Sequence, residues 1–114
     1  MGKIKGKITE YAALLADMLQ EYEQSDNPLE THIIIDEKHH HYQVLRMGWA
    51  DKDTLILRII LYFQIKPDGK IWILANWTED EVADMLVERG VAKSDIVIGL
   101  LPAYVRPHTG FAVA

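Results

Sequence analysis

Residues 55–76 constrain the fold more than any other part of the chain. In LILRIILYFQIK, every second residue is large and apolar, without a break: Leu55, Leu57, Ile59, Leu61, Phe63 and Ile65. Side chains alternate between the two faces of a strand, so this pattern predicts a long strand with one face in the core. The residues PDG that follow have turn chemistry, and KIWILAN returns as a partner strand. The segment therefore predicts a β-hairpin.

Two further strands are predicted before this hairpin. THIIID (residues 31–36) is rich in β-branched residues, and HYQVLRMGW (residues 41–49) combines aromatic and apolar residues. A turn over residues 37–40 would join them. That turn would place His32 opposite Leu45, so the strands would run antiparallel.

Two helices are expected on either side of the strands. Apolar residues recur at helical spacing over residues 7–24 and define one buried stripe. The segment WTEDEVADMLVERG contains a predicted capping box, with Thr78 as the N-cap and Glu81 three residues later. Gly90 is the expected residue beyond its C-terminal end.

The C-terminal part is less regular. VAKSDIVIGLL predicts a turn or short helix followed by a strand, and the two prolines of PAYVRPHTGFAVA favour an extended segment. The order of elements predicts an α+β fold, in which an antiparallel meander of four to five strands is flanked by two α-helices. We expect one domain over residues 1–114.

Charge and composition restrict the possible functions. The net charge is −5, which disfavours direct binding of nucleic acid, and the absence of cysteine excludes disulfides, zinc–thiolate sites and a cysteine nucleophile. The basic cluster Lys3, Lys5 and Lys7 is interpreted as a solvated, frayed end, and a DNA-binding arm is the alternative. No apolar run is long enough to span a membrane, so a cytoplasmic location is expected.

The run His39–His40–His41 raises the question of a metal or catalytic site. Along a strand, His39 and His41 would point to one side and His40 to the other, and two ligands do not complete a zinc site. We therefore expect no metal and no cofactor. An enzyme, such as a nuclease subunit or hydrolase that uses His41 with Asp36, remains an alternative.

Several stretches together resemble the XisI family, the fdxN-element excision controlling factors of cyanobacteria. They are HYQVLRMGW, DGKIWI with NWTED, ERGVAKSDIVIG, and the closing pattern P-x-Y-x-R-P-x-T-x-F-A-V-A. The similarity runs over almost the full length. The pair His39–His40 departs from the family, which commonly has a charged pair there.

The resemblance implies a regulatory function. Family members are accessory factors for site-specific excision of a DNA element during heterocyst development, and they are usually encoded beside a companion, XisH, which resembles an endonuclease. Since the chain is acidic, we expect a non-enzymatic protein that acts through contacts with the companion, with the recombinase, or with its own copies. Aromatic and arginine residues dominate such contacts. The candidates are His41, Tyr42, Trp49, Tyr104, Arg106 and Phe111.

Overall fold

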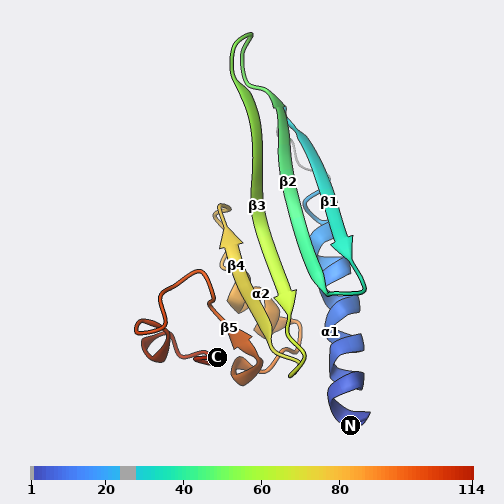
Figure 1. The fold of residues 1–114 in the computed structure, drawn as a ribbon, viewed down its shortest axis with the longest axis vertical. Coiled ribbons are helices and arrows are strands. Elements are labelled where there is room, and N and C mark those ends of the chain that lie inside the picture. The colour runs from blue at the N-terminus through green and yellow to red at the C-terminus, as the bar shows by residue number, and fades with distance from the viewer. Residues whose placement is uncertain (1, 24–27) are drawn as a thin grey trace.

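The computed structural model describes residues 2–23 and 28–114, and it is built around a single sheet (Figure 1). The strands are β1 (Glu30–Asp36), β2 (His41–Trp49), β3 (Leu55–Ile65), β4 (Ile71–Asn76) and β5 (Ile96–Val97). They lie in chain order, and the first four are antiparallel, whereas β5 runs parallel to β4. The predicted α+β class and meander are therefore confirmed, with a parallel fifth strand added.

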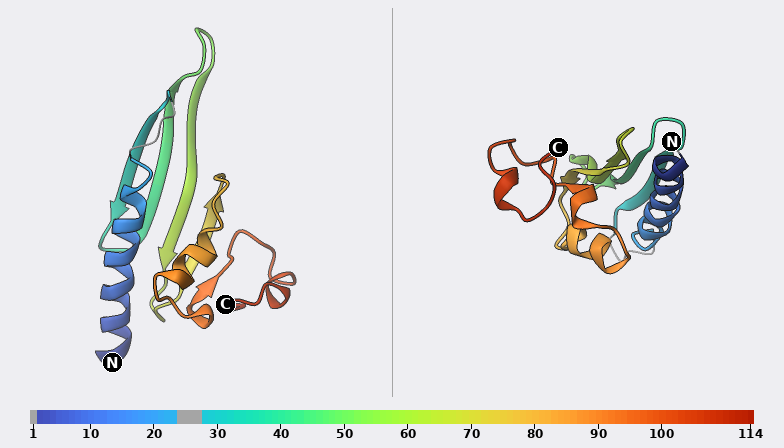
Figure 2. Two further views of the ribbon diagram at one scale, coloured as in Figure 1. Left: turned by 180° about the vertical axis from the view of Figure 1, so that it is seen from behind. Right: turned by 90° about the horizontal axis from the view of Figure 1, so that it is seen from below.

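Both helices lie against the same face of the sheet. They are α1 (Gly2–Gln20) and α2 (Val82–Glu88), and the front and back views in Figures 1 and 2 place them together behind the strands. Buried residues of α1, including Leu15 and Met18, belong to the same core as Val44 and Phe63 of the strands. Thus one face of the sheet is covered by helices, and we call the other the open face.

The β1–β2 hairpin has the predicted register, with His32 opposite Leu45, and β1 begins one residue earlier than predicted, at Glu30. Asp36 organises its turn, because its carboxylate accepts hydrogen bonds from the backbone N–H groups of Lys38 and His39. His40 adopts a positive φ of 58°, a conformation that histidine visits more readily than most residues with a side chain.

The long strand β3 differs from the prediction that one face would be core throughout. Leu61, Phe63 and Ile65 are buried, but Leu55, Leu57 and Ile59 are exposed. The reason is a β-bulge: Val44 pairs with Leu61 and Leu45 with Ile59, which leaves Ile60 as an extra residue. An extra residue moves every following side chain to the opposite face.

The β2–β3 hairpin extends well beyond the rest of the molecule. Figure 1 shows its tip far above β4 and above both helices, and the molecule is 51 Å long but only 30 and 23 Å across. We call residues 45–59 the arm. Because the last pair of β1 with β2 joins Glu30 to Met47, the arm beyond that point is a two-stranded ribbon.

The helices differ from the sequence prediction at their starts. Helix α1 begins at Gly2 rather than at residue 7, so the three lysines lie in helical turns instead of a frayed end, and Lys7 forms an ion pair with Asp95 at 3.2 Å. The helix also ends earlier than predicted, at Gln20, with residues 21–23 in a turn; residue 24, the predicted end, lies outside the described residues. Thr78 does not cap α2. Its hydroxyl donates to Asn76 Oδ1 and accepts from the N–H of Asp80, in a bend that precedes the helix.

The C-terminal part folds partly as predicted. A short 3₁₀ helix, η1 (Lys93–Asp95), leads into β5, and Gly90 takes a positive φ of 101° beyond α2. The expected extended tail is wrong, because residues 102–110 form turns and a second 3₁₀ helix, η2 (Arg106–His108). Proline fixes φ at a value that a 3₁₀ turn also accepts.

Candidate interaction surface

The open face of the arm has a continuous apolar surface. Directly paired residues of neighbouring strands share a face, and the β2–β3 pairs here are Leu45 with Ile59, Met47 with Leu57, and Trp49 with Leu55. We call the following residues the open-face patch: Ile34, Leu45, Met47, Trp49, Leu55, Leu57 and Ile59. Leu57 is 64% exposed and Trp49 62% exposed. Such groups of large apolar side chains on a surface typically mark interaction sites.

The six residues predicted as contacts lie in different environments. Trp49 and Tyr104 are exposed, Tyr104 to 80%, so both side chains are accessible. Tyr42 is 1% exposed and packs in the core, so its side chain is not available at the surface. His41 is half-buried, and its Nδ1 lies 2.7 Å from the hydroxyl of Tyr62.

Arg106 and Phe111 secure the C-terminal segment to the sheet. The Arg106 guanidinium lies 5.0 Å from the ring centroid of Trp72, and its Nε donates to the carbonyl of Leu101 at 3.1 Å. Phe111 is half-buried against the core, and the ammonium of Lys93 lies over its ring. Both side chains therefore have internal contacts, and the structure does not group them with Trp49.

His39, His40 and His41 line one pocket of about 460 Å³, but Asp36 is not part of its lining and the three rings have different hydrogen-bond partners. The Asp36 carboxylate lies 2.9 Å from His39 Nδ1, whereas His40 Nδ1 faces the hydroxyl of Tyr42 at 3.1 Å. The hydrogen bond to the His39 side chain, and next the one from the His39 N–H, lower the pKa of Asp36. His41 bonds to Tyr62 on the neighbouring strand instead. Among residues 2–23 and 28–114, no three histidine or carboxylate side chains are placed to hold a metal ion.

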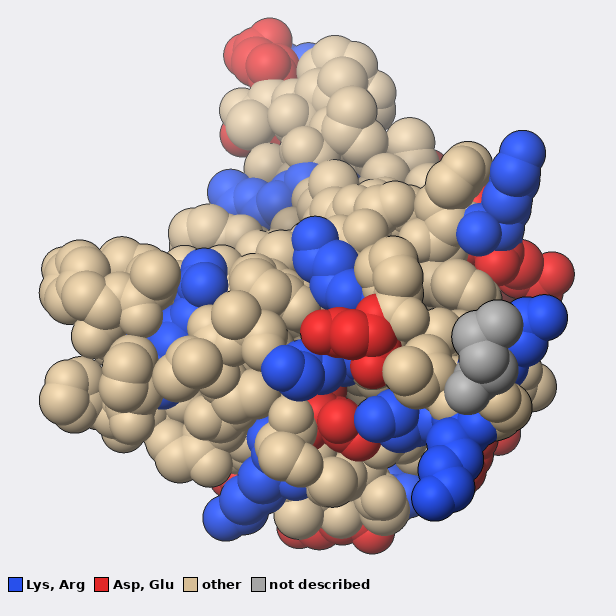
Figure 3. Space-filling view, turned by 60° about the horizontal axis from the view of Figure 1, so that its bottom comes forward, with Lys and Arg blue, Asp and Glu red and all other residues tan. Residues whose placement is uncertain are grey.

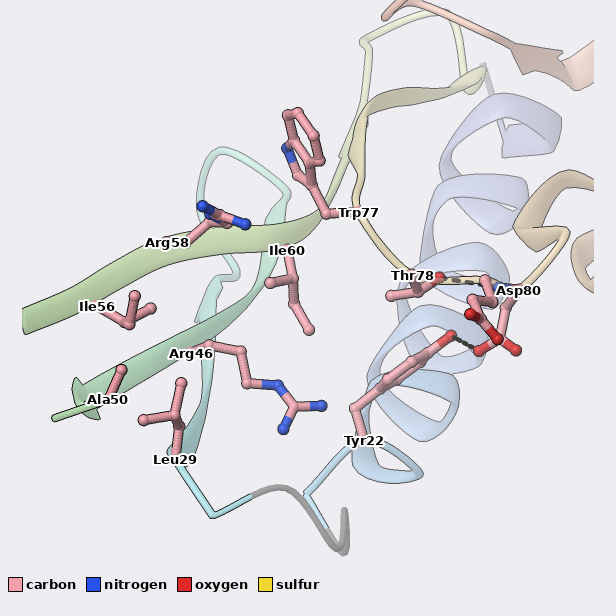
Figure 4. Close-up of a pocket in the computed structure, with 11 residues that line it drawn as sticks. Tyr22, Leu29, Arg46, Ala50, Ile56, Arg58, Ile60, Trp77, Thr78 and Asp80 are labelled. Atoms are coloured by element: carbon pink, nitrogen blue, oxygen red, sulfur yellow. Dashed lines mark hydrogen bonds between the residues drawn. The ribbon is translucent and has the colours of Figure 1, made fainter. Parts of the chain in front are cut away.

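A second accessible feature lies on the helix side of the arm. Figure 4 shows a pocket between the arm, the end of α1 and the segment after β4, with a volume of about 600 Å³. Trp77 is 71% exposed at its margin, with the Arg58 guanidinium 5.6 Å from the ring centroid. Tyr22 donates a 2.7 Å hydrogen bond to Asp80 across the pocket. Trp77 directly precedes the predicted capping box, and nothing in its sequence context indicated exposure.

Charge is distributed in small groups of opposite sign. On the face turned forward in Figure 3, lysine and arginine side chains alternate with aspartate and glutamate. Arg58 lies directly opposite Arg46 in the β2–β3 ladder, so two cations are adjacent on the helix side of the arm. Within the described part of the chain, no helix has the length and apolar character needed to cross a membrane.

These observations define a class: a small α+β domain with helices on one sheet face, a projecting hairpin and an uncovered apolar patch. A family model described as XisI protein matches residues 5–113. The chain therefore belongs to the XisI family, as the sequence resemblance predicted.

Two solved structures are close to this fold. A XisI-like protein from Anabaena variabilis ATCC 29413 is 37% identical, with a TM-score of 0.85, over 94% of this chain and 99% of that one. The fdxN element excision controlling factor XisI from the same organism is 32% identical, with a TM-score of 0.82, over 95% and 99% of the two chains. The comparison with curated proteins gave no match.

Proposed function

We propose that this protein is a non-enzymatic accessory factor in the site-specific excision of a DNA element, and that it acts by binding other proteins. Family membership supports the excision context, because one relative is named as an excision controlling factor. The observation that carries the mode of action is exposure: Trp49, Trp77 and Tyr104 present large aromatic side chains at the surface. Tryptophan, tyrosine and arginine are the residues that dominate protein interfaces.

The acidic balance supports the same mode of action. Binding of DNA depends on many cations that neutralise phosphates, and this chain has 12 basic and 17 acidic residues. A partner protein with nuclease or recombinase activity would supply the DNA contacts, and this chain would position or activate it. The XisH-like companion is the first candidate.

We place the companion contact at Trp77 and Arg58 beside the pocket on the helix side of the arm. A tryptophan at a concave site with an arginine over its ring can bury a large area and fix the orientation of a partner. The indole is accessible to a partner, since 71% of it is exposed.

Titration calorimetry of the purified chain with the XisH-like companion tests this proposal. We expect a complex at micromolar concentration, and we expect Trp77→Ala to weaken it at least tenfold, in line with about 1.4 kcal/mol or more for a tryptophan at an interface centre. Ile4→Ala, which removes an exposed apolar side chain near the start of α1, is the matched control and should bind normally.

Two results would count against the proposal. Failure of the companion and the recombinase to associate with the chain at tens of micromolar would remove the mode of action. Hydrolysis of a DNA substrate by the purified chain alone, lost in His41→Ala, would favour the enzymatic alternative.

A further inference from the structure

The arm leaves a large apolar area without cover from its own chain. Taking roughly 200 Å² for a whole large side chain, the exposed parts of Ile34, Trp49, Leu55, Leu57 and Ile59 present on the order of 500 Å². That is near the upper end of the patches found on monomeric proteins. Both helices lie on the other face, and the C-terminal segment packs around Trp72 on β4, away from the arm.

The arm also has little support of its own. A two-stranded ribbon is marginally stable in water unless its face packs against another layer. Beyond Met47 the arm has only two strands, and Ala50–Thr54 at its tip is closed by one backbone hydrogen bond and by the Asp51 side chain. A projecting ribbon with an apolar face therefore gains stability when a second layer covers it.

We infer that a second copy of this chain covers the open-face patch, so that two arms pack face to face about a two-fold axis. Two sheet faces pack about 10 Å apart with interdigitating side chains, as in a β-sandwich. The same patch is used on both copies, which is the rule for an isologous dimer. This inference does not depend on the proposed function.

The distribution of charge favours a second copy of the chain as the partner that covers the open-face patch. Each chain has a net charge of −5, so two copies repel each other least when they meet at an uncharged surface. The seven residues of the open-face patch are all uncharged, and Gln43 continues the uncharged surface along β2. Glu30 and His32 of β1, which are paired with each other at 3.6 Å, lie at its margin as a polar rim.

The opposite face of the arm is not suited to self-association. There Arg46 and Arg58 are cross-strand neighbours, and Glu79 and Asp80 line the same pocket, so two copies that met on this side would have to remove charged groups from water. The exposed area of the open-face patch is also sufficient for a dimer interface. Two patches of this size remove on the order of 1,000 Å² from water, which is the lower limit for a specific interface. The half-buried Leu45 and Met47 add to it.

Light scattering during gel filtration, over a range of protein concentrations, tests the dimer. We expect a dimer for the wild type and at least a hundredfold increase in its dissociation constant for Leu57→Glu, because two carboxylates would be buried face to face. Leu100→Glu introduces the same charge at an exposed leucine outside the patch and should remain dimeric. Circular dichroism confirms that both variants are folded.

A thiol-protection experiment locates the interface without a disruptive charge. The chain has no cysteine, so Leu57→Cys and Arg58→Cys each supply a single thiol, on opposite faces of the same strand. We expect the maleimide reaction rate at position 57 to fall at least tenfold as the protein concentration rises through the dimer range, and the rate at position 58 to stay constant.

The inference would be overturned by a strict monomer at hundreds of micromolar. It would equally be overturned by a dimer that persists in Leu57→Glu and protects position 58. A thiol at position 57 that only the XisH-like companion protects would assign the patch to that partner instead. None of these results bears on whether Trp77→Ala weakens companion binding, so the two proposals can fail separately.

Discussion

At the scale of single residues, Trp72 is the anchor of the C-terminal segment. Its ring lies between the ammonium of Lys66 and the guanidinium of Arg106, at 5.1 and 5.0 Å from the centroid. Gly99 approaches the same ring so closely that an added Cβ would lie 2.6 Å from Trp72 Cε3. Glycine is required here by the close approach of backbone to ring.

The substitution Gly99→Ala should therefore destabilise the protein. Either the indole or the segment must move, and overpacking of this kind typically costs about 1–3 kcal/mol. Urea denaturation followed by tryptophan fluorescence measures the change. Gly6→Ala in α1 is the control, because nothing lies within 4 Å of its Cβ position, and it should raise stability by about 0.5–1 kcal/mol. Equal stability of the Gly99→Ala variant and the wild type would contradict this packing.

Residue identity alone could not sort buried from exposed candidates. Tyr42 and Trp49 lie seven residues apart in one predicted strand, and both are large aromatics of the kind found in cores and interfaces. Their environments differ because they lie on opposite faces of β2: Tyr42 belongs to the core beneath the helices, whereas Trp49 lies on the open face with Leu45 and Met47. Alternation separates the two side chains, but it does not say which face of the sheet the helices cover.

At the scale of elements, α1 is attached to η1 by polar contacts as well as by the core. Tyr11 donates a 2.7 Å hydrogen bond to Asp95, which also accepts from Lys7. Burial and then the Asp95 hydrogen bond raise the pKa of Tyr11 to about 12. These contacts join residues 84 and more positions apart, so they bring the first and last parts of the chain together.

This pairing predicts a specific alkaline instability. Between pH ~10, where an unfolded tyrosine ionises, and pH 12, the folded protein retains a proton that the unfolded chain loses. Stability conferred by Tyr11 is therefore full below pH ~10 and is lost as the pH rises toward 12. In Tyr11→Phe, the urea midpoint should fall less steeply across this range, with stability at pH 7 reduced by about 1–2 kcal/mol.

Part of the alkaline decline will remain in that variant, because burial and the Asp80 hydrogen bond also raise the pKa of Tyr22. Tyr104→Phe, at an exposed position, should follow the wild-type curve and serves as the control. If Tyr11→Phe followed that curve as well, the Tyr11–Asp95 contact would not contribute to stability.

Element boundaries could be predicted where local chemistry sets them. The β1–β2 register and the Pro67–Gly69 turn follow from alternation and turn residues, and both are confirmed. The bulge at Ile60 was not predictable, because the apolar residues on both sides of it form one unbroken alternation. The capping box failed because the Thr78 hydroxyl oxygen accepts from the N–H of Asp80 in a bend, and α2 begins only at Val82.

At the scale of the whole molecule, the arm and the body differ in how they are supported. The body has the helices, the core and the C-terminal segment, whereas the arm has the paired strands and the surface that we assign to a second copy.

The parallel strand β5 also belongs to this scale. Its two residues return to β4 only after α2 has crossed behind the sheet, and so short a strand gives no periodic signal.

Hydrogen exchange should distinguish these two parts. Amides of residues 48–56 should exchange fast in dilute protein and become protected by at least tenfold as the concentration rises, because the dimer adds a layer over the arm. Amides around Phe63 and Ile73 should show no such dependence, since they are covered within one chain. Mass spectrometry of exchanged peptides measures both regions in one experiment, and a concentration-independent arm would argue against the second layer.

The extra residue in β3, Ile60, also determines whether the open face of the arm is apolar. Because side chains in a strand alternate, a β3 that kept Ile60 in the ladder and paired without the bulge would turn Leu55, Leu57 and Ile59 toward the side of the helices and bring Ile56 and Arg58 to the front. The body would be unchanged, while the side chains of β3 on the two faces of the arm would be exchanged. In this fold, the register of β3 decides which of its side chains are available to bind a partner, and the composition of the strand alone does not.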